Sequence, residues 1–92
     1  MEIEFKRGPK GFYVGDESHP SAEILFEETS KEVIIYHTEV QPALSGQGIG
    51  RKLVNLVTEE AKKVNKPIIS YCSYADKVLS NDPPTLSWNI KK

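Results

Sequence analysis

Residues 40–50 read VQPALSGQGIG and join two segments of different periodicity. The segment before them, residues 32–40, is rich in β-branched and aromatic side chains, which is typical of a long buried strand. After them, apolar residues recur every three or four positions from Gly50 to Val64, which is the spacing of an amphipathic helix. The stretch therefore predicts a strand, a glycine-rich loop and a helix, in that order.

Shorter strand patterns precede this unit. Residues 2–6 and 12–14 each have the pattern of a short strand, and the glycine and proline between them predict a hairpin. Ala22, Ile24 and Phe26 then occupy alternate positions, which is the period of a half-buried strand. Because short connections join these strands to each other and to the long strand, we expect antiparallel pairing throughout this half of the chain.

The segments after the main helix complete the expected fold. The helix is expected to end before Pro67, because proline disfavours a helical conformation at the preceding residue. Residues 68–71 resume a strand pattern, which a right-handed crossover would place parallel to its partner, and a short helix is expected over Tyr74–Leu79. We therefore expect an α+β fold in one domain, residues 1–92, with a mixed, mostly antiparallel sheet of about five strands, one main helix after the glycine loop and a short second helix.

Periodicity also assigns side chains to faces. Strict alternation along the long strand predicts one face made of Ile34, Tyr36, Thr38 and Val40 and the other made of Val33, Ile35, His37 and Glu39. Helical spacing predicts an apolar stripe made of Leu53, Leu56, Val57, Ala61 and Val64.

Composition limits the classes of partner and compartment. With 12 basic and 13 acidic residues the net charge is −1, so we expect neither a nucleic-acid partner nor a membrane partner. The N-terminus lacks the pattern of a secretory signal, and no apolar run approaches transmembrane length. Cys72 is the single cysteine, which excludes an intramolecular disulfide and fits a reducing compartment. We expect a cytoplasmic protein that is a monomer or a weak homodimer.

The three glycines of the loop, Gly46, Gly48 and Gly50, suit an anion site. Glycine permits positive φ angles and leaves room in front of its amide, while a helix start offers unpaired N–H groups and partial positive charge. A glycine cluster alone is equally consistent with a flexible connection. The loop differs from a nucleotide-triphosphate loop because Arg51 and Lys52 follow the last glycine, and its glycine spacing is not that of a dinucleotide fingerprint.

The loop resembles the coenzyme A signature of the GCN5-related (GNAT) N-acetyltransferases, in which a strand ending in Val-x-Pro precedes Arg or Gln, then Gly-x-Gly-x-Gly or Ala. Residues 40–42 and 46–50 match this signature in register, whereas Ser45 replaces the usual Arg or Gln. The chain also looks like the compact GNAT-like subfamily at residues 37–40 and 72–74, His-Thr-Glu-Val and Cys-Ser-Tyr. By this resemblance we expect it to be without the amino-terminal helices and carboxy-terminal strands of larger members, so the acceptors of those members are not transferred to it.

The resemblance implies acetyl-coenzyme A as the cofactor. By that resemblance the backbone of Val40 would pair with the pantetheine arm, and the amides of residues 47–50, with Arg51 nearby, would hold the pyrophosphate. Ser45 stands where a side-chain contact is expected to be missing. The implied cofactor-binding residues are Thr38, Val40, Ser45, Gly46, Gln47, Gly48, Ile49, Gly50, Arg51 and Tyr74.

Three residues are candidates for the chemistry of transfer. Cys72 follows the predicted parallel strand at the start of a short helix, where a thiolate would be favoured and could take the acetyl group, although a small buried apolar role fits its position equally. His37 could activate the thiol or the amine, or simply pack within its strand. Glu39 shares the predicted face of His37 and could orient it or act as the base. No acidic or cysteine partner has ligand spacing to a histidine, so we predict no metal.

Three functions remain open at this point. The first is an acetyl-CoA-dependent N-acetyltransferase that acts on an unidentified amine, either by direct attack or through Cys72. The alternative is a non-catalytic coenzyme A-binding module that acts through a protein partner. In a third interpretation the chain is an interaction domain whose glycine loop is only a connector.

Overall fold

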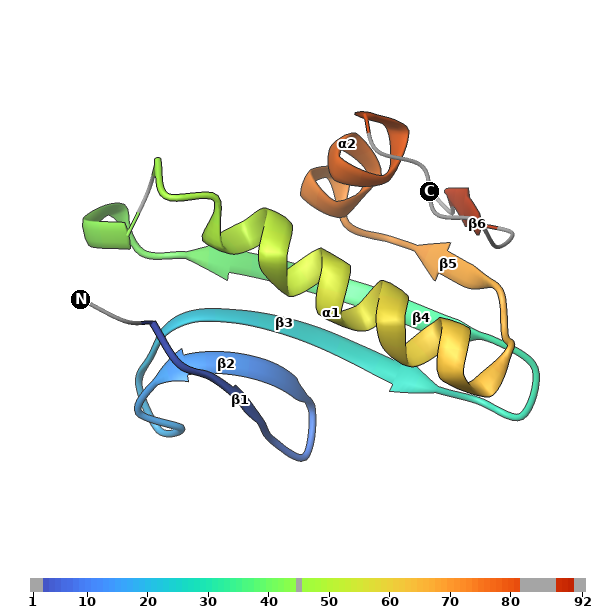
Figure 1. Cartoon of the computed structure of the whole chain (residues 1–92), viewed down its shortest axis with the longest axis horizontal. Helices are drawn as coiled ribbons and strands as arrows, with labels where there is room; N and C mark the ends of the chain where they lie inside the picture. The colour runs from blue at the N-terminus through green and yellow to red at the C-terminus, as the bar shows by residue number, and fades with distance from the viewer. Residues whose placement is uncertain (1–2, 45, 82–87, 91–92) are drawn as a thin grey trace.

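The fold consists of one mixed sheet with two helices on one of its faces (Figure 1). The computed structural model describes residues 3–44, 46–81 and 88–90. Its strands are β1 (Phe5–Arg7), β2 (Gly11–Gly15), β3 (Pro20–Glu28), β4 (Val33–Val40), β5 (Ile68–Ser70) and β6 (Trp88–Ile90). Its helices are the 3-10 turn η1 (Pro42–Leu44), α1 (Ile49–Val64) and α2 (Ser73–Asn81).

The strands are arranged in chain order across the sheet, from β1 to β6. The first three pairs are antiparallel, whereas β4–β5 and β5–β6 are parallel. The expected α+β class and the parallel strand after the main helix are thus confirmed. The sheet has six strands instead of the expected five or so, because three residues of the tail add β6 beside β5.

A β-bulge in β4 changes the predicted faces of that strand. Leu25 pairs with His37 and Phe26 pairs with Ile35, so Tyr36 has no partner of its own in β3. One extra residue shifts the period-two alternation, and every later side chain moves to the other face. The prediction that Thr38 and Ile35 point to different faces of the sheet was therefore wrong.

Beyond the bulge, Thr38 and Val40 lie on the helix side of the sheet. They pair with Ile24 and Ala22, which are both buried in the core, and cross-strand partners share a face. His37 and Glu39 consequently lie on the opposite face, which we call the outer face. His37 and Glu39 share a face with each other, as predicted, but the prediction that they share it with Val33 and Ile35 was wrong.

The core lies between the sheet and α1. The predicted apolar stripe is confirmed at Leu53, Val57 and Ala61, which are fully buried. It is wrong at Leu56, which is half-buried, and at Val64, which is exposed. Two other side chains, Val54 and Thr58, are buried in their place, and the Thr58 hydroxyl donates to the Val54 carbonyl at 3.1 Å. The rotation of a helix against its sheet decides which of two adjacent residues turns inward, and helical period alone does not give that rotation.

The ends of both helices agree with the expected boundaries within one or two residues. Helix α1 ends in a left-handed Asn65, whose φ is 54°, two residues before Pro67. Helix α2 is longer than the expected Tyr74–Leu79 by one residue at its start and two at its end. Within the described ranges, no helix has the length and apolarity needed to cross a membrane.

Candidate functional site

Strands β4 and β5 form a fork. They pair only where Val33–Ile35 meets Ile68–Ser70, and the Tyr71 N–H adds one bond to the Ile35 carbonyl at 2.9 Å. Beyond that point β4 runs on to Val40, whereas the chain after β5 turns into α2 (Figure 1). In the part of the chain that the structure describes, the second half of β4 therefore pairs with β3 alone.

The open edge of β4 presents backbone groups of two residues. The Gln41 N–H donates to the Ser21 carbonyl at 2.8 Å, so the backbone groups of residue 41 face β3. Successive residues of an antiparallel strand point their backbone groups to alternate edges. Those of Val40 and Thr38 consequently face the open side of the fork, where an extended ligand that contains amides can pair with them as an added strand does.

Two glycines shape the loop that follows. Gly48 is the N-cap of α1 in the left-handed conformation, with φ 71° and no side-chain cap, and Gly46 has φ 80°. A Cβ built at either glycine would meet nothing within 4 Å. Glycine is thus required by the backbone conformation, and it leaves open space before the first turn of α1, where unpaired N–H groups favour an anion.

The third glycine has a different role, because Gly50 is buried in the first turn of α1. A Cβ there would overlap the hydroxyl of Tyr74 and lie 2.6 Å from its Cζ atom. Tyr74, the second residue of α2, therefore packs its ring directly on the backbone of α1. The structure thus brings Tyr74 to the glycine loop, with 42% of the side chain still exposed.

The other implied cofactor residues lie around the same helix start. Gln47 is exposed and lines a hollow of about 570 Å³ together with Leu44 and residues of β1 and β2. Arg51 is exposed in the first turn of α1. Ile49 is buried in the core, so only its backbone is available to a ligand. Ser45 lies outside the described residues.

Cys72 lies in the core just before α2. It is only 9% exposed and belongs to the same cluster of buried side chains as Ala75 and Leu79. Its carbonyl accepts bonds from the Asp76 N–H at 2.9 Å and from the Ser70 hydroxyl at 3.2 Å. Its membership of this core cluster, and not the bonds to its carbonyl, places the thiol on the helix side of the sheet among apolar neighbours.

The three candidate catalytic residues are not brought together on one face. His37 and Glu39 are exposed on the outer face, whereas Cys72 is buried on the helix side. Glu39 lies directly opposite Glu23 in the register of β3 and β4, and both line an outer hollow of about 430 Å³ that His19 also borders. No group of three or more metal-ligating side chains is found among the described residues.

Two further tyrosines, Tyr36 and Tyr71, lie at the fork. Tyr36 and Tyr71 stack with ring centroids 6.0 Å apart and planes 12° apart. The Tyr36 hydroxyl donates to Glu27 at 3.0 Å, and this bond, with smaller contributions from burial and nearby charge, raises the pKa of Tyr36. The available sequence signal was that Tyr36 directly follows Ile34-Ile35, and that Tyr71 follows Ile68-Ile69 after one intervening residue, Ser70.

Comparison with known proteins agrees with this geometry. A family model described as GCN5-related N-acetyltransferase matches residues 11–87. The solution NMR structure of a GCN5-like candidate N-acetyltransferase from Staphylococcus aureus is similar, with a TM-score of 0.77, 37% sequence identity, and coverage of 97% of this chain and 90% of that chain. A search of curated proteins gives no significant match. The chain belongs to the GCN5-related N-acetyltransferase family.

Proposed function

We propose that this protein transfers an acetyl group from acetyl-coenzyme A to an amine. The observation that carries the proposal is the continuity of the open backbone edge at Thr38 and Val40 with the glycine-lined start of α1. A coenzyme lying along this path would have its pyrophosphate at residues 47–50 and its pantetheine amides beside β4. Its acyl end would then point back toward the fork.

The helix start suits a pyrophosphate by shape and by charge. The first turn of α1 contains no acidic residue, and Arg51 and Lys52 follow the last glycine. The N-terminal end of the helix dipole adds partial positive charge at the same place. With no side chain at Gly46 or Gly48, the phosphate oxygens would be able to approach the backbone amides closely.

The burial of Cys72 favours direct transfer over an acetyl-cysteine intermediate. In the direct route the amine nitrogen attacks the thioester carbon, the carbon–sulfur bond breaks, coenzyme A leaves as the thiolate, and the amine loses a proton. The exposed imidazole of His37 and the carboxylate of Glu39 lie on the face where such a proton can be accepted. If Cys72→Ala and Cys72→Ser both retained full transfer activity, the acetyl-cysteine route would be excluded and direct attack would stand, whereas an acetylated Cys72 that passes its acetyl group to the amine would contradict the direct route.

Calorimetric titration with acetyl-coenzyme A tests the cofactor site. Gly48→Asn and Gly48→Asp form a matched pair, because both residues tolerate left-handed φ and both cap helices, but only Asp places a negative charge at the loop. We expect Asp to weaken binding by about tenfold more than Asn does, which corresponds to about 1.4 kcal/mol of repulsion. Equal affinities for the two variants would contradict pyrophosphate binding at this loop.

An amine panel separates catalysis from binding alone. Saturable coenzyme binding with acetylated product, detected by mass, supports the enzyme. Saturable binding without product from any amine would favour the non-catalytic coenzyme A-binding module, for which the separation of Cys72 from His37 is the supporting observation. Absence of binding to folded wild-type protein would overturn both functions.

A further inference from the structure

The stacked tyrosines stand on either side of the fork. Tyr36 is the bulge residue directly after Ile35, the last residue of β4 that pairs with β5, and Tyr71 directly follows Ser70, the last residue of β5. Ile35 and Ser70 are fully buried on the helix side, whereas the two tyrosines are 48% and 54% exposed. The aromatic pair therefore lies on the outer face, where the two strands begin to separate.

This pair is a fixed and exposed aromatic surface. The rings contact one another, and the bond from the Tyr36 hydroxyl to Glu27 holds one ring in place. In the described ranges, Tyr36 and Tyr71 are two of only four large apolar side chains with more than a third of their surface exposed. Exposed apolar surface of this kind, next to a predicted site, indicates a ligand or a partner.

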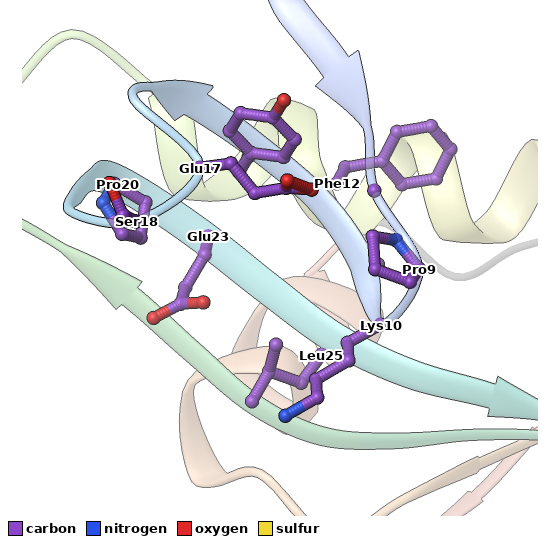
Figure 2. A pocket seen from close by; sticks show the side chains of 11 residues that line it. Pro9, Lys10, Phe12, Glu17, Ser18, Pro20, Glu23 and Leu25 are labelled. Carbon is purple, nitrogen blue, oxygen red and sulfur yellow. The ribbon is translucent and has the colours of Figure 1, made fainter.

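The charge around the pair favours a cation. Glu27 accepts the Tyr36 hydroxyl, and Glu23 lies directly opposite Glu39, an arrangement of like charges that costs stability unless a cation is nearby. Figure 2 shows Glu23 pointing out from β3 on this face. Lys10 lines a hollow of about 380 Å³ together with Glu27 and Tyr36, so the carboxylates of Glu23, Glu27 and Glu39 share this face with the ammonium of Lys10. Aromatic faces attract ammonium groups electrostatically, and carboxylates beside them strengthen that preference.

We infer that the outer mouth of the fork binds the acceptor as a primary alkylammonium, on the rings of Tyr36 and Tyr71 with Glu27 as counter-charge. This inference rests on the proposed function. A coenzyme along Thr38 and Val40 would fill the open edge of β4, so the acceptor has to enter from the outer face. The alkyl chain packs on the rings, the ammonium passes a proton to the imidazole of His37 or the carboxylate of Glu39, and the neutral amine then attacks the thioester carbon.

A free alkylamine and a lysine side chain carry the same reacting group, so the test uses both. The ring signals of Tyr36 and Tyr71 are followed by NMR while butylamine, 1,4-diaminobutane or a short lysine peptide with blocked ends is added, with and without saturating coenzyme A. We expect saturable shifts of both rings with the amines. Glutamate is the negative control, because it carries carboxylates as well as an amine, and it is expected to give no saturable shifts of the rings. Whichever of the alkylamines and the peptide has the higher affinity identifies the source of the group.

Variants distinguish recognition from a merely structural stack. We expect Tyr71→Leu to raise the KM and the dissociation constant for the amine by about fivefold to tenfold, in keeping with the loss of a cation–π contact. Tyr71→Phe keeps a ring and is expected to stay within about twofold of the wild type. Glu27→Gln removes the counter-charge and should lower the affinity for the amine without changing the affinity for coenzyme A. Tyr13→Leu makes the same change on β2, away from the fork, and is the control.

Several outcomes would overturn the inference. One is the absence of saturable ring shifts in wild-type protein that binds coenzyme A, which would leave the proposed function intact. Another is an equal loss of amine affinity in Tyr13→Leu and Tyr71→Leu. If Tyr71→Leu failed to fold, Tyr71→Phe and Glu27→Gln would test the inference, and an unchanged affinity for the amine in Glu27→Gln would contradict it. Ring shifts in a protein that does not bind coenzyme A would end the acceptor role together with the proposed function.

Discussion

The two halves of β4 differ in what they pair with. Residues 33–35 have a strand on each side and bury their inward side chains, as the fully buried Ile35 does. Among residues 3–44, 46–81 and 88–90, only β3 pairs with residues 36–40, and their other edge is open. The same strand thus supplies stability before the bulge and unpaired backbone groups after it, so we expect mutations in the two halves to affect different measurements.

The largest expected effect lies in the first half. Ile35→Ala should lower the free energy of unfolding by about 2–4 kcal/mol, because it empties a fully buried site between the sheet and the helices. Val40→Ala, in the half-exposed second part of the strand, should cost about 1 kcal/mol, since less surface is buried there. Denaturant unfolding measures both. Equal losses in the free energy of unfolding for Ile35→Ala and Val40→Ala would contradict the proposed difference between the two halves of β4.

Helix α1, which follows β4, and helix α2, which follows β5, contact each other where Tyr74 packs on Gly50. Gly50→Ala should destabilise the wild type by about 1–3 kcal/mol, because the new methyl group overlaps the ring. In a Tyr74→Ala background the same change should stabilise α1 by about 0.5–1 kcal/mol, since alanine favours a helix interior over glycine. The sign reversal, measured as a double-mutant cycle, is the decisive result. The same loss in both backgrounds would mean that another contact excludes the side chain.

Thr38 offers a smaller but more specific comparison, because its hydroxyl oxygen is buried and has no hydrogen-bond partner among the residues that the structure describes. Thr38→Val should leave stability unchanged or raise it by about 1 kcal/mol, because it removes an unsatisfied buried group. Thr58→Val is the matched control, since it loses the bond to Val54 and should cost about 0.5–1 kcal/mol. If the Thr38 hydroxyl serves the coenzyme, thermal unfolding will show no loss while calorimetry shows weaker binding. A clear loss of stability would place its partner within the protein.

The smallest expected effect is the pH dependence of Tyr36. The bond to Glu27 raises the pKa of Tyr36 above its ordinary value of 10.0, so the folded state favours the protonated phenol. That contribution is fully present below the pKa of the unfolded chain and is lost as the pH rises through the higher pKa of the folded protein. Glu27→Gln should move the absorbance titration of Tyr36 back toward lower pH, with Tyr36→Phe identifying the signal. An unchanged titration would mean that the bond does not persist in solution.

The elements that local chemistry marks were predictable from the sequence. The start of α1 follows from the glycines and its end from Pro67, because backbone conformation is set by the residues at those positions. The parallel strand β5 followed from the order of strand, helix and strand. The resemblance of residues 40–50 led to the family, which the family model confirms.

What the sequence left open depends on contacts between distant segments. Nothing in residues 32–40 marks Tyr36 as an extra residue, because the bulge exists only relative to β3. The packing of Tyr74 on Gly50 and the burial of Cys72 arise when α2 meets the core, and periodicity within α2 does not determine them. The catalytic roles of Cys72, His37 and Glu39 stay predictions.

The bulge at Tyr36 inserts one unpaired residue into the alternation of β4. Residues 33–35 lie on the faces that strict alternation predicts, and residues 37–40 lie on the faces opposite to those it predicts. Deleting Tyr36 would leave His37 paired with Leu25 and residues 37–40 on their present faces. Pairing Tyr36 itself with Leu25 would instead turn His37 and Glu39 toward α1, and would turn Thr38 and Val40 outward with their backbone groups facing β3. Core composition and ligand edge are therefore coupled through the register of β4 on β3, because a slip by one residue would change both the faces and the open edge of residues 37–40.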